Sequence, residues 1–149
     1  MDYQPRNEMF YGAKTGKHLQ KIDKALPGSH TKRMIAASIL VQLRTNISRL
    51  NTYLYKIKIT ETDKCECGAT ETVPHFLFCC PRWSAQRRDM RAAHGSRYCD
   101  LSHALGGYSI HEENGKKVDG EKDKWQPHLN AVKATIEFAK ATGRLQRQI

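Results

Sequence analysis

The residues best suited to chemistry lie close together between positions 65 and 80. Four of the five cysteines and one of the seven histidines fall in this stretch, in the order Cys65, Cys67, His75, Cys79 and Cys80. Thiolate and imidazole are borderline-soft ligands that suit zinc, and four of them leave no open position for water or substrate. The spacing therefore predicts a closed, structural zinc site rather than a catalytic one.

Local sequence indicates two elements that would present these ligands. Gly68 directly follows Cys67 and supplies the positive φ that a tight turn needs, so a knuckle or short hairpin is predicted for the first half. In the second half, Thr72 can cap a helix, and Pro74 is tolerated in the first turn of that helix.

The fourth ligand is ambiguous from geometry alone. His75 and Cys79 are four residues apart and share a helix face. Pro81 disfavours helical geometry at Cys80, so Cys80 can leave the helix and also reach the metal. Both cysteines therefore stay open as the fourth ligand on geometry.

Disulfide bonds and unligated thiols are the alternatives to a metal site. No apolar signal segment follows Met1 and the cysteine count is odd, which disfavours a secreted disulfide scaffold. We expect whichever of Cys79 and Cys80 is not a ligand, and also Cys99, to be a small buried hydrophobe.

Several longer stretches carry a family resemblance. They include Leu-Val-Gln-Leu-Arg-Thr at 40–45, Leu-Asn-Thr-Tyr-Leu-Tyr-Lys-Ile at 50–57, Cys-x-Cys-Gly, and Glu-Thr-Val-x-His-Phe-Leu-Phe-x-Cys, with flanking matches at 21–31, 105–109 and 131–145. Together they resemble the C-terminal tail of fungal non-LTR (LINE-type) retrotransposon polyproteins, which follows the reverse transcriptase and RNase H domains. The resemblance implies that the ligands are Cys65, Cys67, His75 and Cys80, and so favours Cys80 over Cys79.

Length and composition fit one modest domain with a lean core. The chain has 149 residues, 39% of them hydrophobic, and a mean hydropathy of −0.68. We predict a mainly α fold, a small helical domain with one CCHC zinc knuckle and a long loop before the last helix. Its expected parts are a flexible N-terminal arm (1–16), a helical zinc-knuckle domain (17–95), a loop or linker (96–126), and a C-terminal amphipathic helix and tail (127–149).

Apolar periodicity and helix-stop residues predict five helices in addition to the one capped by Thr72. The helix over 31–44 is apolar on more than one side and is expected to be the central core element. The last helix is expected to dock its apolar stripe on the zinc-helix core. The five are predicted over 18–26, over 31–44, through Ile47, Leu50, Leu54 and Ile57, from Pro81 to Gly95, and from Pro127 to Gly143.

The net charge of +10 is concentrated in the first part of the chain. Residues 1–60 hold eleven Lys or Arg against three Asp or Glu. This bias suggests a polyanion partner, single-stranded RNA or DNA, although a solvated basic surface is the plain alternative. The candidate nucleic-acid contacts are Arg82, Arg87, Arg88 and Arg91, expected on the outer face of the helix after the knuckle, together with Arg49, Lys56, Lys58 and Tyr53.

The sequence shows no set of residues typical of a catalytic site. The acidic residues cluster between Glu112 and Asp123, where no element is expected to hold them around Mg²⁺. There is no Gly-rich phosphate loop and no nucleophile elbow. We therefore predict that the chain is not an enzyme.

Two functions remain from this pattern. The first is a non-catalytic, zinc-binding nucleic-acid-binding module. The second, implied by resemblance to retroelement-derived avirulence-type effectors of powdery-mildew fungi, is a domesticated effector that binds a host protein. With no signal segment and no apolar run long enough to span a membrane, a cytoplasmic or nuclear location is expected, or delivery to the host by a non-conventional route for an effector.

Overall fold

The computed structural model describes residues 30–108, 112–113, 116–117 and 126–146. Within them the fold is mainly helical, which confirms the predicted class. The predicted N-terminal arm and the helix over 18–26 lie outside the described residues. The helices are α3 (His30–Thr45), α4 (Asn51–Lys56), α5 (Ser84–His94), α6 (Leu101–Ala104) and α7 (Leu129–Thr142).

Shorter elements connect these helices. A π-helical turn spans His75–Cys79, and 3₁₀ turns span Pro81–Trp83 and Gly95–Arg97. Two-residue strands β1 (Glu112–Glu113) and β2 (Lys116–Lys117) pair antiparallel. Among the helices that the structure describes, none is both long enough and apolar enough to cross a membrane.

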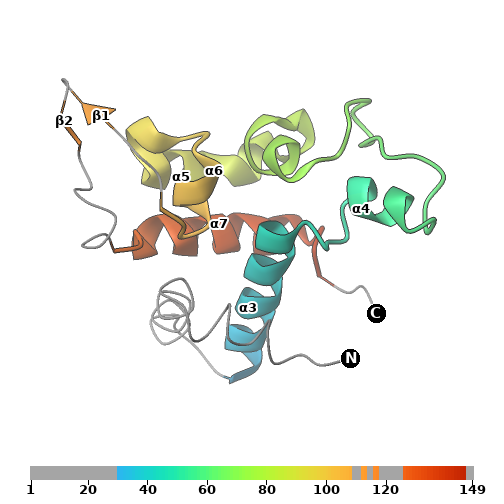
Figure 1. The fold of residues 1–149 in the computed structure, drawn as a ribbon, viewed down its shortest axis with the longest axis horizontal. Coiled ribbons are helices and arrows are strands. Elements are labelled where there is room, and N and C mark those ends of the chain that lie inside the picture. Colours follow the sequence, from blue (N-terminus) through green and yellow to red (C-terminus); the bar gives the residue numbers. More distant parts are fainter. Residues whose placement is uncertain (1–29, 109–111, 114–115, 118–125, 147–149) are drawn as a thin grey trace.

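Helix α7 is the centre of the fold. It contacts α3, α5 and α6, and Figure 1 shows it running between α5 and α6 on one side and α3 on the other. Its side chains Val132, Ile136 and Phe138 are buried, so the predicted docking of its apolar stripe is confirmed. Gly143 ends the helix with a φ of 66°, a left-handed conformation that glycine adopts without strain.

Helix α3 is less central than predicted. Ala36, Ile39 and Leu43 form a buried stripe, but Met34 and Val41 on other faces are 59% and 53% exposed. The second apolar face therefore has no partner among the described residues. One stripe of α3 packs on α7, and α7 occupies the core position that the sequence pattern assigned to α3.

Helix α4 begins later than its apolar spacing suggested. Asn46 has a φ of 61°, which ends α3 at the predicted break. Leu50 is fully buried at the start of α4, whereas Ile47 and Ile57 are exposed. The stripe of four apolar residues is thus only partly buried, because the helix is short and projects from the rest of the molecule (Figure 1).

The segment predicted as a linker over 96–126 contains core residues. Ala104 and Leu105, in and after α6, are buried in the same apolar cluster as α7. Thr135 Oγ1 donates a hydrogen bond to Ala104 O at 2.9 Å, and the Arg44 guanidinium donates to Leu105 O. Residues 97–107 are therefore part of the domain, and the linker prediction is wrong for them.

Two buried histidines lie beside α7. His94 and His103 are 4% and 5% exposed, with their ring centroids 5.9 Å apart. His94 Nε2 lies 3.0 Å from Thr135 Oγ1. Burial, followed by the nearby Arg97 and His128, lowers the pKa of His103 to about 4, and burial also lowers the pKa of His94.

The depressed pKa of His103 predicts a loss of stability in acid. In the unfolded chain, His103 binds a proton with its ordinary pKa of about 6.5. In the folded chain, its ring stays neutral until the pH approaches about 4. The unfolded state then holds more protons in this window, so the free energy of unfolding falls as the pH falls through it. Ring NMR shifts of His103 should remain those of a neutral imidazole at about pH 5.5, where the same ring in urea-unfolded protein is mostly charged. A folded-state midpoint near 6.5 would contradict this.

Candidate metal centre

Four predicted ligands converge in space. The ligand atoms of Cys65, Cys67, His75 and Cys80 all lie within 4.8 Å of one another. Cys65 Sγ is 3.6 Å from Cys80 Sγ, and Cys67 Sγ is 3.3 Å from His75 Nε2. All the cysteines are free thiols, so the group is a cluster of separate donor atoms that can hold a metal ion.

The first two ligands come from a tight knuckle, as predicted. Cys65 N–H donates to Ala69 O at 2.6 Å, and Gly68 N–H donates to Cys65 O at 2.9 Å. Gly68 has a φ of 98°, a conformation that a residue with a Cβ rarely adopts. The turn thereby aims both cysteine side chains at the same point.

A π turn supplies the other two ligands. Thr72 Oγ1 accepts a hydrogen bond from His75 N–H at 3.1 Å, which is the predicted cap. Cys80 N–H donates to His75 O at 2.8 Å, five residues back rather than the four of an α-helix. The wider turn, with Cys80 in an extended conformation, brings Cys80 beside His75.

The remaining cysteines differ from their prediction. Cys79 lies outside the cluster and is exposed, and Cys99 is exposed as well. Neither is the small buried hydrophobe that was expected. Cys79 points away because the π turn shifts the inward position by one residue relative to an α-helix.

Arg87 is buried beneath the metal cluster instead of facing outward. Its side chain is 6% exposed, and it donates to Leu77 O at 2.7 Å, Cys80 O at 2.8 Å and Phe76 O at 2.9 Å. These carbonyls belong to the π turn and the residue after it. The prediction that Arg87 forms an exposed basic stripe with Arg91 is therefore wrong.

A signal for this burial was present in the sequence. Trp83, Arg87, Met90 and His94 recur at spacings of four, three and four, the pattern of one helix face. Trp83 packs against the core, and Met90 and His94 are buried with Arg87. Ala93, which lies next to His94 but off this face, is exposed.

Arg82 lies over the cluster and affects the thiol of Cys65. Burial raises the pKa of Cys65, but hydrogen bonds from the Cys67 backbone and from Arg82 outweigh it and lower the pKa to about 6. Burial, together with the adjacent Cys65, raises the pKa of Cys80 to about 11. The cluster thus has one thiol disposed to ionise beside one that stays protonated until a cation binds.

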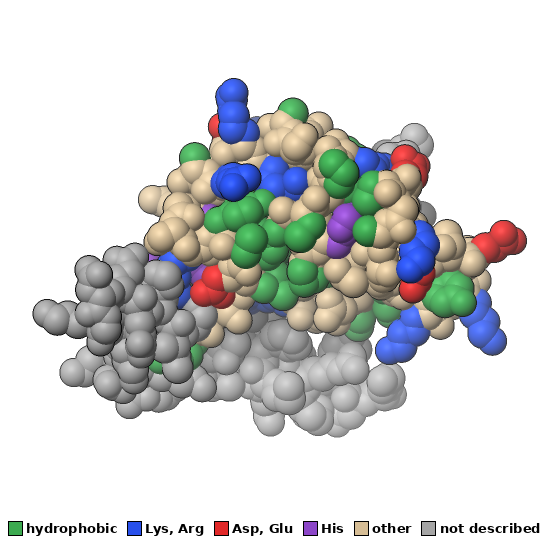
Figure 2. Space-filling model, turned by 90° about the horizontal axis from the view of Figure 1, so that it is seen from above, with side chains coloured by type: hydrophobic (Ala, Val, Ile, Leu, Met, Phe, Trp, Pro, Cys, Tyr) green, Lys and Arg blue, Asp and Glu red, His purple; other side chains and the backbone are tan. Residues whose placement is uncertain are grey.

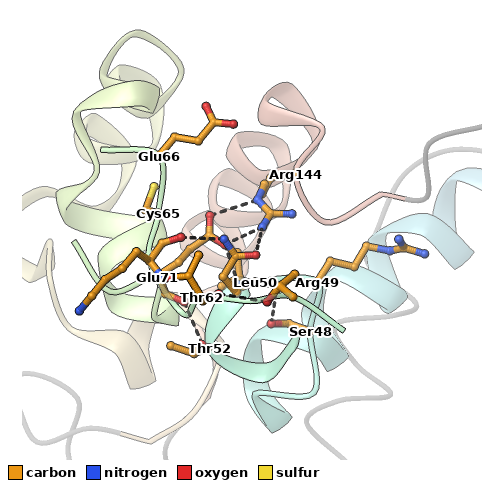
Figure 3. Close-up of polar contacts among 12 residues, drawn as sticks. Ser48, Arg49, Leu50, Thr52, Thr62, Cys65, Glu66, Glu71 and Arg144 are labelled. Atoms are coloured by element: carbon orange, nitrogen blue, oxygen red, sulfur yellow. Dashed lines mark hydrogen bonds and ion pairs between the residues drawn. The ribbon is translucent and has the colours of Figure 1, made fainter. Parts of the chain in front are cut away.

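Glu71 is a buried carboxylate next to the knuckle that the sequence pattern did not single out. It is 1% exposed, and Arg144 contacts both of its oxygens, with Nη2 to Oε1 at 2.6 Å and Nε to Oε2 at 3.1 Å. Asn51 N–H donates to the same Oε1 at 2.7 Å. Figure 3 shows this network joining α4, the knuckle and the end of α7. Arg144 is 73 residues away in the chain, and no local pattern links the two.

The other predicted basic residues do not form one surface. Arg88 and Arg91 are exposed on α5, with Arg91 lying 5.0 Å from the ring of Tyr98. Arg49, Lys56 and Lys58 are exposed around α4, with Tyr53 half-buried beside them. Helices α4 and α5 lie at opposite ends of the described structure (Figure 1). On the face shown in Figure 2, the Lys and Arg side chains are separate rather than one continuous stripe.

Comparison with protein-family models, with curated proteins and with solved structures finds no match to this chain.

Proposed function

We propose that the chain is a non-catalytic zinc-binding module that binds single-stranded RNA or DNA. The observation that carries the proposal is the convergence of three thiols and one imidazole from a knuckle and a π turn. Zn–S bonds of about 2.3 Å in a tetrahedron place sulfur atoms about 3.8 Å apart. The Cys65–Cys80 separation of 3.6 Å fits this spacing, and four soft protein ligands fit a closed zinc site.

A zinc ion would act here by joining segments rather than by reacting. The ion would link Cys65 and Cys67 of the knuckle to His75 and Cys80 of the π turn, and would favour the thiolate form of all three cysteines. Arg87 and the Phe76–Phe138 ring contact, with centroids 5.2 Å apart, connect that turn to α5 and α7. Loss of the ion should therefore disturb the helical core as well as the knuckle.

The nucleic-acid partner is inferred from charge. The net charge is +10, and cations extend from both ends of the described fold, on α5 and around α4. Cations that replace counterions on phosphates give affinity that falls steeply with salt. This inference and the resemblance to the tail of fungal non-LTR retrotransposon proteins both support a module that binds nucleic acid without chemistry of its own.

Salt-dependent binding is the test of this proposal. Zinc-loaded protein should bind a labelled single-stranded RNA oligonucleotide in a fluorescence anisotropy titration. The affinity should be lower at the higher of two salt concentrations. Replacing Arg88 and Arg91 by Ala should reduce the slope of log affinity against log salt by about 1.4, because each phosphate contact to a single strand contributes about 0.7. Chelation of the metal should weaken the binding.

The matched control removes the same charge elsewhere. Lys32 and Arg33 are exposed in the first turn of α3, and their double replacement by Ala also lowers the net charge by two. An equal loss from both double variants would show that only overall charge matters, and the α5 surface would be rejected. No measurable binding at low salt would overturn the nucleic-acid proposal itself.

A second candidate is a retroelement-derived effector that binds a host protein. The observation in its favour is the set of large apolar side chains exposed around α4, at Ile47, Tyr55, Ile57 and Ile59. A stable protein complex that survives nuclease treatment would favour this function. Association that disappears with nuclease would favour nucleic-acid binding.

A further inference from the structure

A cavity of about 350 Å³ lies beside the metal cluster, between the knuckle and the end of α7. Ligand pockets in proteins begin at about 300 Å³, so the space is sufficient for a small planar group. The side chains that line it include two guanidiniums, two carboxylates, an amide and an indole, from Arg82, Arg144, Glu66, Glu71, Asn51 and Trp83.

One side of this cavity is rigid. The Glu71 carboxylate holds the Arg144 guanidinium through Nε and Nη2, and Nη2 also lies 3.3 Å from Asn51 Oδ1. Within the described residues, the Nη1 group of Arg144 makes no hydrogen bond. Arg144 is thus fixed in place with one donor group still available. Figure 3 shows Arg144 reaching toward Glu71 from the end of α7.

The opposite side supplies an acceptor and a stacking surface. The Glu66 side chain is 82% exposed, and Arg82 Nη2, 3.3 Å from Glu66 Oε2, is its ion-pair partner. The Arg82 guanidinium lies 4.7 Å from the centroid of the Trp83 ring, and that indole packs against the hydrophobic core. A planar ligand can stack on this cation–aromatic pair, as bases do in single-strand-binding proteins.

These groups match one nucleobase best. A carboxylate accepts two parallel N–H donors, and guanine alone among the RNA bases presents two adjacent N–H donors, N1–H and the N2 amino group, on its Watson–Crick edge. Guanine O6 and N7 are acceptors for arginine. Building on the proposed function, we infer that this cavity takes an unpaired guanine of a single-stranded nucleic acid. Glu66 binds the N1–H and N2–H donors, Arg144 Nη1 donates to O6, and the base stacks on the Arg82 guanidinium, which itself lies over the Trp83 ring.

The test compares oligonucleotides that differ at one base. Zinc-loaded protein is titrated into labelled oligouridine strands of equal length whose central residue is G, A, C or U. The strand with G should bind about tenfold more tightly than the others, the discrimination typical of one good bidentate contact. Glu66→Gln should reduce this preference to about twofold or less, because an amide presents only one acceptor oxygen.

A matched variant separates base recognition from charge. Glu137→Gln removes the same charge from an exposed carboxylate on α7, outside the cavity. It should tighten binding to all strands slightly and keep the preference for G. Zinc content and Tm should be unchanged in both variants, because both side chains are exposed and neither belongs to the metal cluster.

Tryptophan fluorescence gives an independent readout. The chain has two tryptophans, so Trp125→Phe leaves Trp83 as the single reporter. The strand with G should quench Trp83 emission more strongly than the strand with U when both are saturating. Equal affinities for all strands, or a G preference that survives Glu66→Gln, would overturn the cavity assignment and leave the proposed function intact. If none of the strands binds in a salt-dependent way, the proposed function is overturned, and the inference with it.

Discussion

Replacing Cys80 with Ser is expected to abolish zinc binding and unfold the domain, whereas Cys79→Ser is expected to do neither. Cys80 is fully buried in the donor cluster, and the adjacent Cys79 is exposed outside it. Zinc contributes an apparent ~10–16 kcal/mol to the folding of small zinc domains, which is as large as the whole stability of a typical domain. The loss of one of four ligands should therefore remove most of the folded population.

The measurement is zinc content by metal analysis together with the helical signal of circular dichroism on heating. Wild type and Cys79→Ser should each bind one zinc per chain and unfold cooperatively, and chelation of wild type should reproduce the Cys80→Ser result. Equal zinc loss in the two variants would contradict the conclusion that the π turn makes Cys80, and not Cys79, the metal ligand. A Cys80→Ser protein that keeps zinc and its Tm would remove Cys80 from the ligand set.

Arg87→Met is expected to lower the free energy of unfolding by about 3–5 kcal/mol, because three buried carbonyls lose the charged donor that they share. Met keeps much of the aliphatic volume but leaves the carbonyls of Phe76, Leu77 and Cys80 without their shared donor. Each buried carbonyl left unpaired costs about 1–3 kcal/mol. The effect should appear in urea unfolding of zinc-loaded protein.

Arg88→Met is the control for this result. Arg88 is the next residue on α5, and its side chain is 87% exposed, so the same substitution should change stability by no more than about 0.5 kcal/mol. Arg87→Lys should lie between the two, because an ammonium cannot reproduce the planar guanidinium fork. A loss of RNA affinity in Arg87→Met without loss of stability would contradict the buried role and restore Arg87 as a surface contact.

Much of the metal cluster was predictable because its ligands are close in sequence. Gly68 fixes the knuckle, Thr72 caps the second segment, and His75 follows at a spacing that local backbone geometry determines. The ends of α3 at Asn46 and of α7 at Gly143 were predictable for the same reason. Each helix ends at a residue that takes a positive φ, and residue type indicates where that can happen. Helix periodicity also identified the buried face of α7.

Side-chain partners distant in the chain were not predictable in this way. Charged residues were assigned to the surface by type, but the π turn leaves carbonyls that need a donor, and Arg87 turns inward to supply it. Glu71 is buried because Arg144, from the far end of the chain, neutralises it. Residues 104–105 belong to the core because α7 passes beneath them.

The sequence by itself determined the kinds of donor, three of the four ligands, the knuckle, the helical class and the basic charge, since each depends on residue type and short spacing. Local geometry left Cys79 and Cys80 open, the family resemblance favoured Cys80, and the structure brings Cys80 into the cluster. Only the tertiary structure decided that Arg87 is buried and that Arg144 meets Glu71 beside a cavity. These outcomes depend on which polar groups remain unpaired once the helices pack. The need to give each buried polar group a hydrogen-bond partner arises only in the assembled fold.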